Sequence, residues 1–132
     1  MRIYITHCSA KKNDLLRHTS KKVTPDILYT SKRIQRFIKE CKERRVEWAI
    51  FSDKYGVWFP HTKQAWYEKS PDSVTEQEFK KLLEDFDQKL APYSEIWFYH
   101  NPGRFHRLYK RLLQETKLRD RVRLFTHVKD IT

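Results

Sequence analysis

The sequence predicts an α/β fold: a single three-layer αβα domain over residues 1–132, built around a mostly parallel four-stranded sheet. Short apolar, β-rich runs alternate along the chain with amphipathic helical patterns, the order that is typical of βαβ units. No linker, internal repeat or low-complexity segment interrupts this alternation, and a chain of 132 residues is large enough for one domain with its own core.

The first half of the chain contains two predicted strands with a helix between them. Residues 2–6 alternate in polarity and are rich in β-formers, which predicts the first strand. In residues 31–45 apolar side chains recur at helical spacing, and Thr30 or Ser31 can cap this helix. Residues 46–51 form a nearly continuous apolar run, as expected for a strand that is buried on both faces.

The second half opens with a long connection over residues 52–72, which the sequence predicts to be irregular. The segment Ser73-Val-Thr-Glu76 matches a capping box, so we expect a helix to begin there and to end before Pro92. The β-rich residues 95–99 predict the third strand.

A last helix and strand complete the predicted fold. Asn101 as N-cap, with Pro102 at the first helical position, favours a helix start at this point. Its buried stripe would consist of Phe105, Leu108, Tyr109, Leu112 and Leu113. Residues 122–125 then predict a short fourth strand.

Three polar loops follow the first three predicted strands, at residues 7–12, 52–56 and 100–104. In a parallel sheet the loops that leave the carboxyl ends of the strands converge on one edge, where ligands bind. The two glycines of the chain, Gly56 and Gly103, both lie in these loops. Glycine serves either a turn or the close approach of a ligand, and both interpretations stay open here.

The first loop suits anion binding better than thiol chemistry. A cysteine-phosphatase loop of the form His-Cys-x5-Arg is excluded, because Asp14 stands at the arginine position and would repel phosphate. Cys8 is otherwise expected to be a small, partly buried side chain or a catalytic thiol. Lys11 and Lys12 can pair with phosphate, and Ser9 can donate a hydrogen bond. The pattern Gly-x4-Gly-Lys is absent, which excludes a nucleotide-hydrolysing P-loop.

The second and third loops add an acid–base group and further anion contacts. Asp53 is the one carboxylate placed for acid–base work, and Tyr55 could stack on a base. Asn101 and Arg104, at a helix start, could receive an anion. In the long connection, Lys63, Trp66, Tyr67 and Lys69 combine aromatic rings with flanking charges, as expected for contact with nucleic acid.

The charge of the chain points to a polyanionic partner. Lys and Arg number 28 against 17 Asp and Glu, a formal net charge of +11, which favours RNA or DNA through phosphate neutralisation. No apolar run is long enough to cross a bilayer and no signal peptide is recognised, so we expect a cytoplasmic protein without membrane contact. Cys8 and Cys41 can form neither a disulfide framework nor a zinc site, and no pattern predicts a metal or cofactor.

Three motifs together resemble those of a family of small, largely uncharacterised α/β proteins. They are Cys8-Ser-Ala-Lys-Lys12, Leu28-Tyr29-Thr30-Ser31 and Phe51-Ser-Asp-Lys-Tyr-Gly-Val57, and they agree in order and spacing over about residues 1–70. The first motif is also similar to one in the core domain of archaeosine synthase, which modifies a base of tRNA and is thought to be akin to the uracil-DNA glycosylase-like fold. The resemblance implies a nucleobase or nucleic-acid site around Cys8, Ser9, Lys12, Ser52, Lys54, Tyr55 and Gly56.

The sequence therefore predicts a protein that binds or acts on a nucleobase within RNA or DNA, by base modification or glycosidic-bond chemistry. Lys12 and Lys54 would hold phosphate or stabilise charge, Ser9 and Ser52 would donate hydrogen bonds, and Asp53 would transfer protons. Two other interpretations stay open: a non-catalytic basic module that binds nucleic acid, and an enzyme that acts on free nucleosides or nucleotides. A test of binding that compares polynucleotide with free nucleoside over a range of salt separates them.

Overall fold

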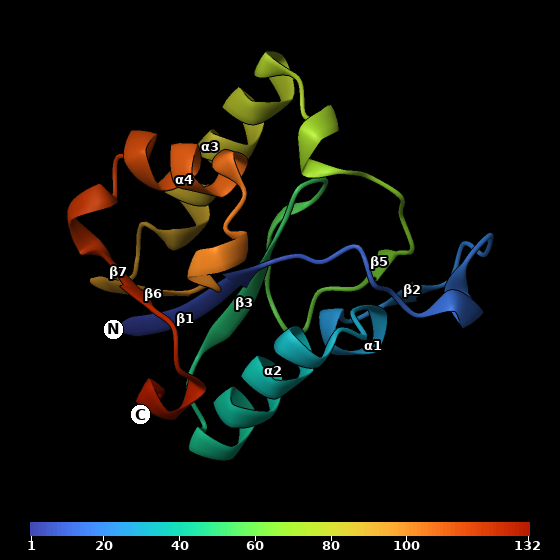
Figure 1. Cartoon of the computed structure of the whole chain (residues 1–132), viewed down its shortest axis with the longest axis horizontal. Helices are drawn as coiled ribbons and strands as arrows, with labels where there is room; N and C mark the ends of the chain where they lie inside the picture. The colour runs from blue at the N-terminus through green and yellow to red at the C-terminus, as the bar shows by residue number, and fades with distance from the viewer.

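A computed structural model describes all residues from Met1 to Thr132 (Figure 1). Its central sheet has five strands in the order β4-β3-β1-β6-β7. The strands are β1 (Arg2–His7), β3 (Trp48–Ser52), β4 (Gly56–Trp58), β6 (Glu95–Tyr99) and β7 (Val122–Phe125). The α/β class and the mostly parallel sheet are thus confirmed, since β3, β1, β6 and β7 run parallel in the positions of the four predicted strands.

The number of strands was predicted wrongly, because β4 lies in the connection that was expected to be irregular. Gly56, with φ +75°, turns the chain back directly after β3. Val57 and Trp58 then pair antiparallel with Phe51 and Ile50 and cover the open edge of the sheet. A second, small antiparallel sheet joins β2 (Lys22–Val23) to β5 (Gln64–Ala65), and strands this short carry no readable period in the sequence.

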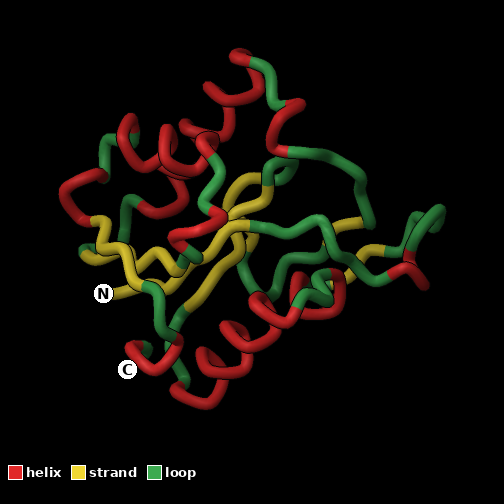
Figure 2. Tube along the Cα trace, viewed as in Figure 1, coloured by secondary structure: helices red, strands yellow, loops and turns green.

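Helices cover both faces of the sheet, with α2 on one face and α3 and α4 on the other (Figures 1 and 2). The α-helices are α1 (Pro25–Leu28), α2 (Lys32–Arg44), α3 (Glu76–Leu90) and α4 (Arg107–Glu115). Short 3-10 helices span Asp14–Leu16, Pro71–Ser73, Pro102–Arg104, Arg119–Arg121 and Val128–Asp130. The buried stripe predicted for α2 packs inward, and the ring of Phe37 stacks on Tyr99 of β6. None of these helices has the length and apolar character that a membrane crossing requires.

The capping box of α3 lies two residues later than predicted. Thr75 is the N-cap, and its hydroxyl oxygen accepts from the Glu78 N–H while the Glu78 carboxylate accepts from the Thr75 N–H. Both Ser73-x-x-Glu76 and Thr75-x-x-Glu78 match the motif, so the pattern alone does not choose between them. Ser73 belongs to the preceding 3-10 helix, which makes the Ser73–Glu76 box wrong.

The start of α4 was also predicted too early. Asn101 caps only the 3-10 helix Pro102–Arg104, where its Oδ1 accepts from the Gly103 N–H. The chain leaves helical geometry at Phe105, and α4 begins at Arg107 with His106 as N-cap. The imidazole Nδ1 of His106 accepts from the Leu108 N–H, a role that sequence preferences do not assign to histidine.

Candidate functional site

The carboxyl ends of β1 and β3 meet at a pocket of about 630 Å³, which we call the Cys8–Asp53 pocket. The two strand ends are joined directly, because the backbone N–H of Asp53 lies 3.4 Å from Cys8 Sγ. The pocket is lined by His7, Cys8, Ser9, Ala10, Lys12, Asp53, Glu68, Lys69, Ser70, Pro71, Ser73, Arg104, His106 and Tyr109. The loops after β1 and β3 therefore converge with the chain around the start of α4.

Asp53 is a buried residue in the lining of this pocket. Its side chain is 2% exposed, and its Oδ1 has no hydrogen-bond partner. Burial raises the pKa of the carboxyl group, and the opposing effects of Cys8 and Lys12 do not cancel this. A raised pKa makes the protonated form of a carboxyl group more accessible, which favours a role in general acid–base chemistry.

His7 supplies a second buried polar atom without a partner. Its ring is stacked on Tyr109 with centroids 4.5 Å apart, and its Nε2 has no hydrogen-bond partner. Burial and the charge of Arg33 lower its pKa to about 3, so the imidazole is neutral. Nδ1 lies 2.9 Å from the carbonyl oxygen of Cys8, and this shortest contact assigns the ring proton to Nδ1. Nε2 is then left as an acceptor.

Cys8 is a buried thiol and not a thiolate. It is 7% exposed, and its Sγ lies 3.3 Å from the hydroxyl of Tyr109. Burial and the neighbouring Asp53 raise its pKa to about 11, which opposes the charged form that a nucleophile needs. Ser9 is half-buried, and its hydroxyl oxygen accepts from the Lys11 N–H.

Three cationic side chains, Lys12, Lys69 and Arg104, line the Cys8–Asp53 pocket, whereas Lys54 does not. Lys12 Nζ lies 4.4 Å and Lys54 Nζ lies 6.0 Å from the centroid of the Tyr67 ring, so these two predicted lysines are close together. Lys69 is bound to Glu78, with 3.1 Å between Nζ and Oε2. Arg104 is exposed and lines the same pocket.

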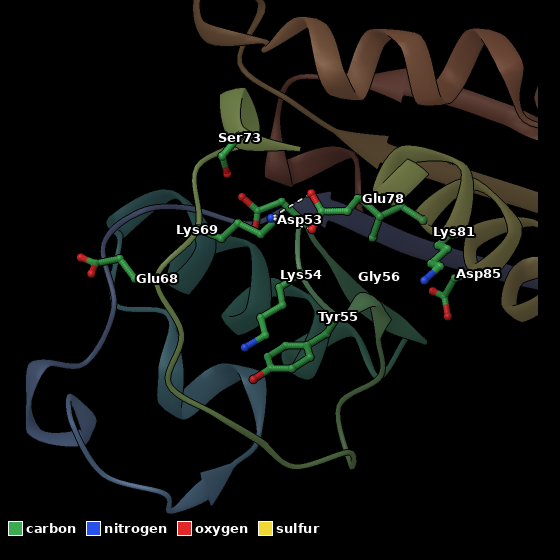
Figure 3. Close-up of a pocket in the computed structure, with 11 residues that line it drawn as sticks. Asp53, Lys54, Tyr55, Gly56, Glu68, Lys69, Ser73, Glu78, Lys81 and Asp85 are labelled. Carbon is green, nitrogen blue, oxygen red and sulfur yellow. Dashed lines mark hydrogen bonds and ion pairs between the residues drawn. The ribbon is translucent and has the colours of Figure 1, made fainter. Parts of the chain in front are cut away.

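A second pocket of about 600 Å³ adjoins the first and is shown in Figure 3. Asp53, Glu68, Lys69 and Ser73 line both. In Figure 3 Lys69 reaches the Glu78 carboxylate near Asp53, while Glu68 points away from these groups. Asp53 therefore lies between two adjoining pockets.

Three of the predicted site residues mainly support the pocket. Ser52 is fully buried, and its Oγ accepts from the N–H groups of Lys54 and Tyr55 and donates to the hydroxyl of Tyr67. Tyr67 is 3% exposed and also bonds to the Tyr29 hydroxyl, so its ring has no free face for a base. Tyr55 is half-buried and donates to the carbonyl of Ala65.

Gly56 is explained by packing. A Cβ at this position would overlap the carboxylate of Asp85 on α3. That carboxylate accepts from the Val57 N–H at 2.7 Å and pairs with Lys89 at 2.9 Å. The turn interpretation of this glycine therefore needs no ligand, although Gly56 does line the second pocket.

Other predicted residues lie outside the Cys8–Asp53 pocket. Asn101 lines a different pocket, beside the start of α2. Lys11 and Lys63 are exposed, and neither lines the Cys8–Asp53 pocket. Trp66 is half-buried, with the Arg17 guanidinium 5.6 Å from its ring. No group of three or more His, Cys, Asp and Glu side chains is arranged to hold a metal ion.

The sequence does not indicate that two residues, Tyr109 and His106, belong to the pocket. Tyr109 reads as part of the apolar stripe of a helix, and only packing brings its hydroxyl to Cys8. His106 reads as an ordinary polar residue near a helix start, although it lines the pocket and bonds to Asp72 at 2.7 Å. His7 differs, because its position at the end of a strand already places it in a loop that could bind a ligand.

The chain matches no protein-family model, no curated protein and no solved structure. The geometry of the Cys8–Asp53 pocket and the motifs around it are therefore the basis for a functional proposal.

Proposed function

We propose that the protein binds a nucleobase of RNA or DNA in the Cys8–Asp53 pocket and acts on it there. One observation carries the proposal: two buried polar atoms without partners, Asp53 Oδ1 and His7 Nε2, belong to residues that line the same pocket. Buried polar atoms are nearly always hydrogen-bonded, and leaving one unpaired costs about 1–3 kcal/mol. A ligand that pairs with both would remove this cost.

A nucleobase fits these two groups. Its edge presents donors and acceptors side by side on a rigid plane, and enzymes that act on bases read this edge in a closed pocket. A ring N–H or amino group would donate to His7 Nε2. Asp53 would accept from a second donor or, when protonated, donate to a ring nitrogen or carbonyl oxygen of the base.

The proposed chemistry is proton transfer at the base. Proton transfer to or from the heterocycle assists many base modifications and many cleavages of a glycosidic bond, and the raised pKa of Asp53 favours this role. Cys8 supports the floor of the pocket as a neutral thiol. Lys12 and Arg104, which line the pocket, would hold the phosphates that flank the base.

Two further observations favour nucleic acid over a free base. The net charge of +11 favours a polyanion through counterion release. The motif Cys8-Ser-Ala-Lys-Lys12, which is similar to one in archaeosine synthase, supplies four residues that line this pocket: Cys8, Ser9, Ala10 and Lys12.

The test is mass spectrometry of nucleosides from tRNA and from DNA after incubation with the protein. We expect a new or missing nucleoside with the wild type, none with Asp53→Asn, and wild-type behaviour with Asp120→Asn. Asp120 is exposed and lies outside the pocket, so this control removes the same charge elsewhere.

Other outcomes would contradict parts of the proposal. Full activity of Asp53→Asn would exclude the acid–base role of Asp53. Salt-dependent binding of polynucleotide without any change of a base would identify a non-catalytic module. Binding of free nucleosides with little salt dependence, and none of polynucleotide, would identify an enzyme of small nucleosides.

A further inference from the structure

A third pocket, of about 520 Å³, lies where the ends of β6 and β7 meet the start of α2. Its lining includes Lys32, Arg33, Arg36, His100, Asn101 and His127, and no carboxylate side chain. We call it the Arg33 pocket. A hollow lined by three cations and two imidazoles has a positive potential, which concentrates anions.

The cations of this pocket differ from those in the rest of the same helix. In the C-terminal half of α2 each exposed cation has an acidic partner, as in Lys39–Glu43, Lys42–Asp26 and Arg44–Glu40. Lys32, Arg33 and Arg36 take part in none of the ion pairs of the structure. Within α2, the cations without an acidic partner are therefore those at the end of the helix that lines the pocket.

Arg33 is the most informative of the three. Its guanidinium donates to Thr6 Oγ1 at 2.6 Å and to the carbonyl oxygen of His7 at 2.8 Å, so its protein partners are neutral. Burial lowers its pKa, which shows that the charged form is poorly solvated. A desolvated cation without a counter-charge is costly, and an anion in the pocket would supply the missing charge.

The position of these cations is also unfavourable for the helix itself. The first turn of α2 carries no acidic residue, whereas the partial positive charge of a helix N-terminus favours acids there. Two neutral groups could assist a bound anion. Asn101 Oδ1 is occupied by the Gly103 N–H, which leaves its amide N–H groups as donors, and His100 Nδ1 is buried without a partner.

We propose that the Arg33 pocket binds a phosphate group, and that in function this is a backbone phosphate of the nucleic acid whose base occupies the Cys8–Asp53 pocket. The second half of this statement rests on the proposed function. The two pockets are neighbours, because Arg33 lines one and hydrogen-bonds to the backbone of His7, which lines the other. A strand could thus be held by its phosphate on one side of β1 and by its base on the other.

The test compares two double variants that remove the same charge from α2. Lys32→Gln with Arg36→Gln alters the pocket, and Lys39→Gln with Lys42→Gln alters the other half of the helix; all four side chains are exposed, so both variants should fold. Amide signals in an NMR titration with inorganic phosphate report binding. We expect shifts at residues 32–36 and 100–101 in the wild type and in the control variant, and at least tenfold weaker binding in the pocket variant.

A second arm measures the binding of a single-stranded oligonucleotide by fluorescence anisotropy over a range of salt. The pocket variant should lose affinity about tenfold and reduce the salt slope by about 0.7, the value for one lost phosphate contact on a single strand. The control variant should stay within about twofold of the wild type. If phosphate binds but the oligonucleotide does not respond to the pocket variant, the ligand is free phosphate and the backbone assignment is overturned.

Two results would overturn the site itself: no phosphate-dependent shift in the wild type at millimolar phosphate, or equal losses in the two double variants. These failures are distinct from failure of the proposed function. Phosphate binding that persists in a protein that changes no base would contradict the base chemistry alone, and base chemistry that is unaffected by the pocket variant would contradict the phosphate site alone.

Discussion

Gly56→Ala tests whether this glycine serves packing, as the structure indicates, and not a ligand. The backbone at Gly56 has φ +75°, a conformation that costs a residue with a Cβ about 1–2 kcal/mol. The new methyl group would also displace the Asp85 carboxylate from the buried Val57 N–H. An unpaired buried N–H costs a further ~1–3 kcal/mol. We therefore expect the free energy of unfolding to fall by about 2–5 kcal/mol.

Urea denaturation, followed by fluorescence, measures this loss. Gly103→Ala is the matched control, because the nearest atom to its added Cβ would be Asn101 Oδ1 at 3.5 Å, an ordinary contact, and its φ is not positive. This variant should stay within about 0.5 kcal/mol of the wild type.

A double-mutant cycle with Asp85→Ala isolates the cause. Without the carboxylate there is neither an overlap nor a hydrogen bond to lose, so Gly56→Ala should cost only the ~1–2 kcal/mol of backbone strain in that background. Equal costs in the two backgrounds would refute the overlap with Asp85. A Gly56→Ala protein within about 0.5 kcal/mol of the wild type would refute the whole reasoning.

Three further outcomes follow from the buried groups of the pocket. Burial lowers the pKa of His7 from 6.5 to about 3, so between these values the unfolded chain binds a proton that the folded one does not. The free energy of unfolding should therefore decrease as pH falls below 6.5, by up to about 1.4 kcal/mol per pH unit, and His7→Gln should flatten this part of the curve; parallel curves would contradict it. Because its pKa is raised from 9.0 to about 11, Cys8 should react with iodoacetamide on the order of 100-fold more slowly than an ordinary thiol, as measured by mass spectrometry of the native protein; rapid labelling would show a thiolate. Tyr67→Phe should lower the unfolding free energy by about 1–3 kcal/mol, because the buried hydroxyls of Tyr29 and Ser52 lose a partner; an unchanged urea midpoint would show that they find another.

Much of the fold could be predicted because each parallel strand carries its own signal. The strands β1, β3 and β6 have five or six residues each, long enough for a period to be visible, and β7 has four that are mostly β-formers, Val122-Arg-Leu-Phe125. Short elements were not predicted, because a strand such as β4 contains only Gly56, Val57 and Trp58 and forms by pairing with β3. The helix start at Thr75 was missed because Ser73 also matches the capping box, and the start at His106 was missed because histidine is not an expected N-cap.

The candidate site was likewise predictable in part from the sequence. The sequence by itself determined that polar loops follow the apolar strands, and the α/β order then implies that Cys8 and Asp53 lie at one edge of the sheet. Only the tertiary structure decided which side chains are available for chemistry, because burial and partners are set by residues far apart in the chain. In the structure, Tyr67 and Ser52 hydrogen-bond to each other and support the pocket, whereas Asp53 and His7 each have a buried polar atom without a partner. Asn101 lines the Arg33 pocket and not the Cys8–Asp53 pocket. Local sequence encodes period, charge and turns, whereas desolvation and hydrogen-bond pairing arise only when distant segments pack together.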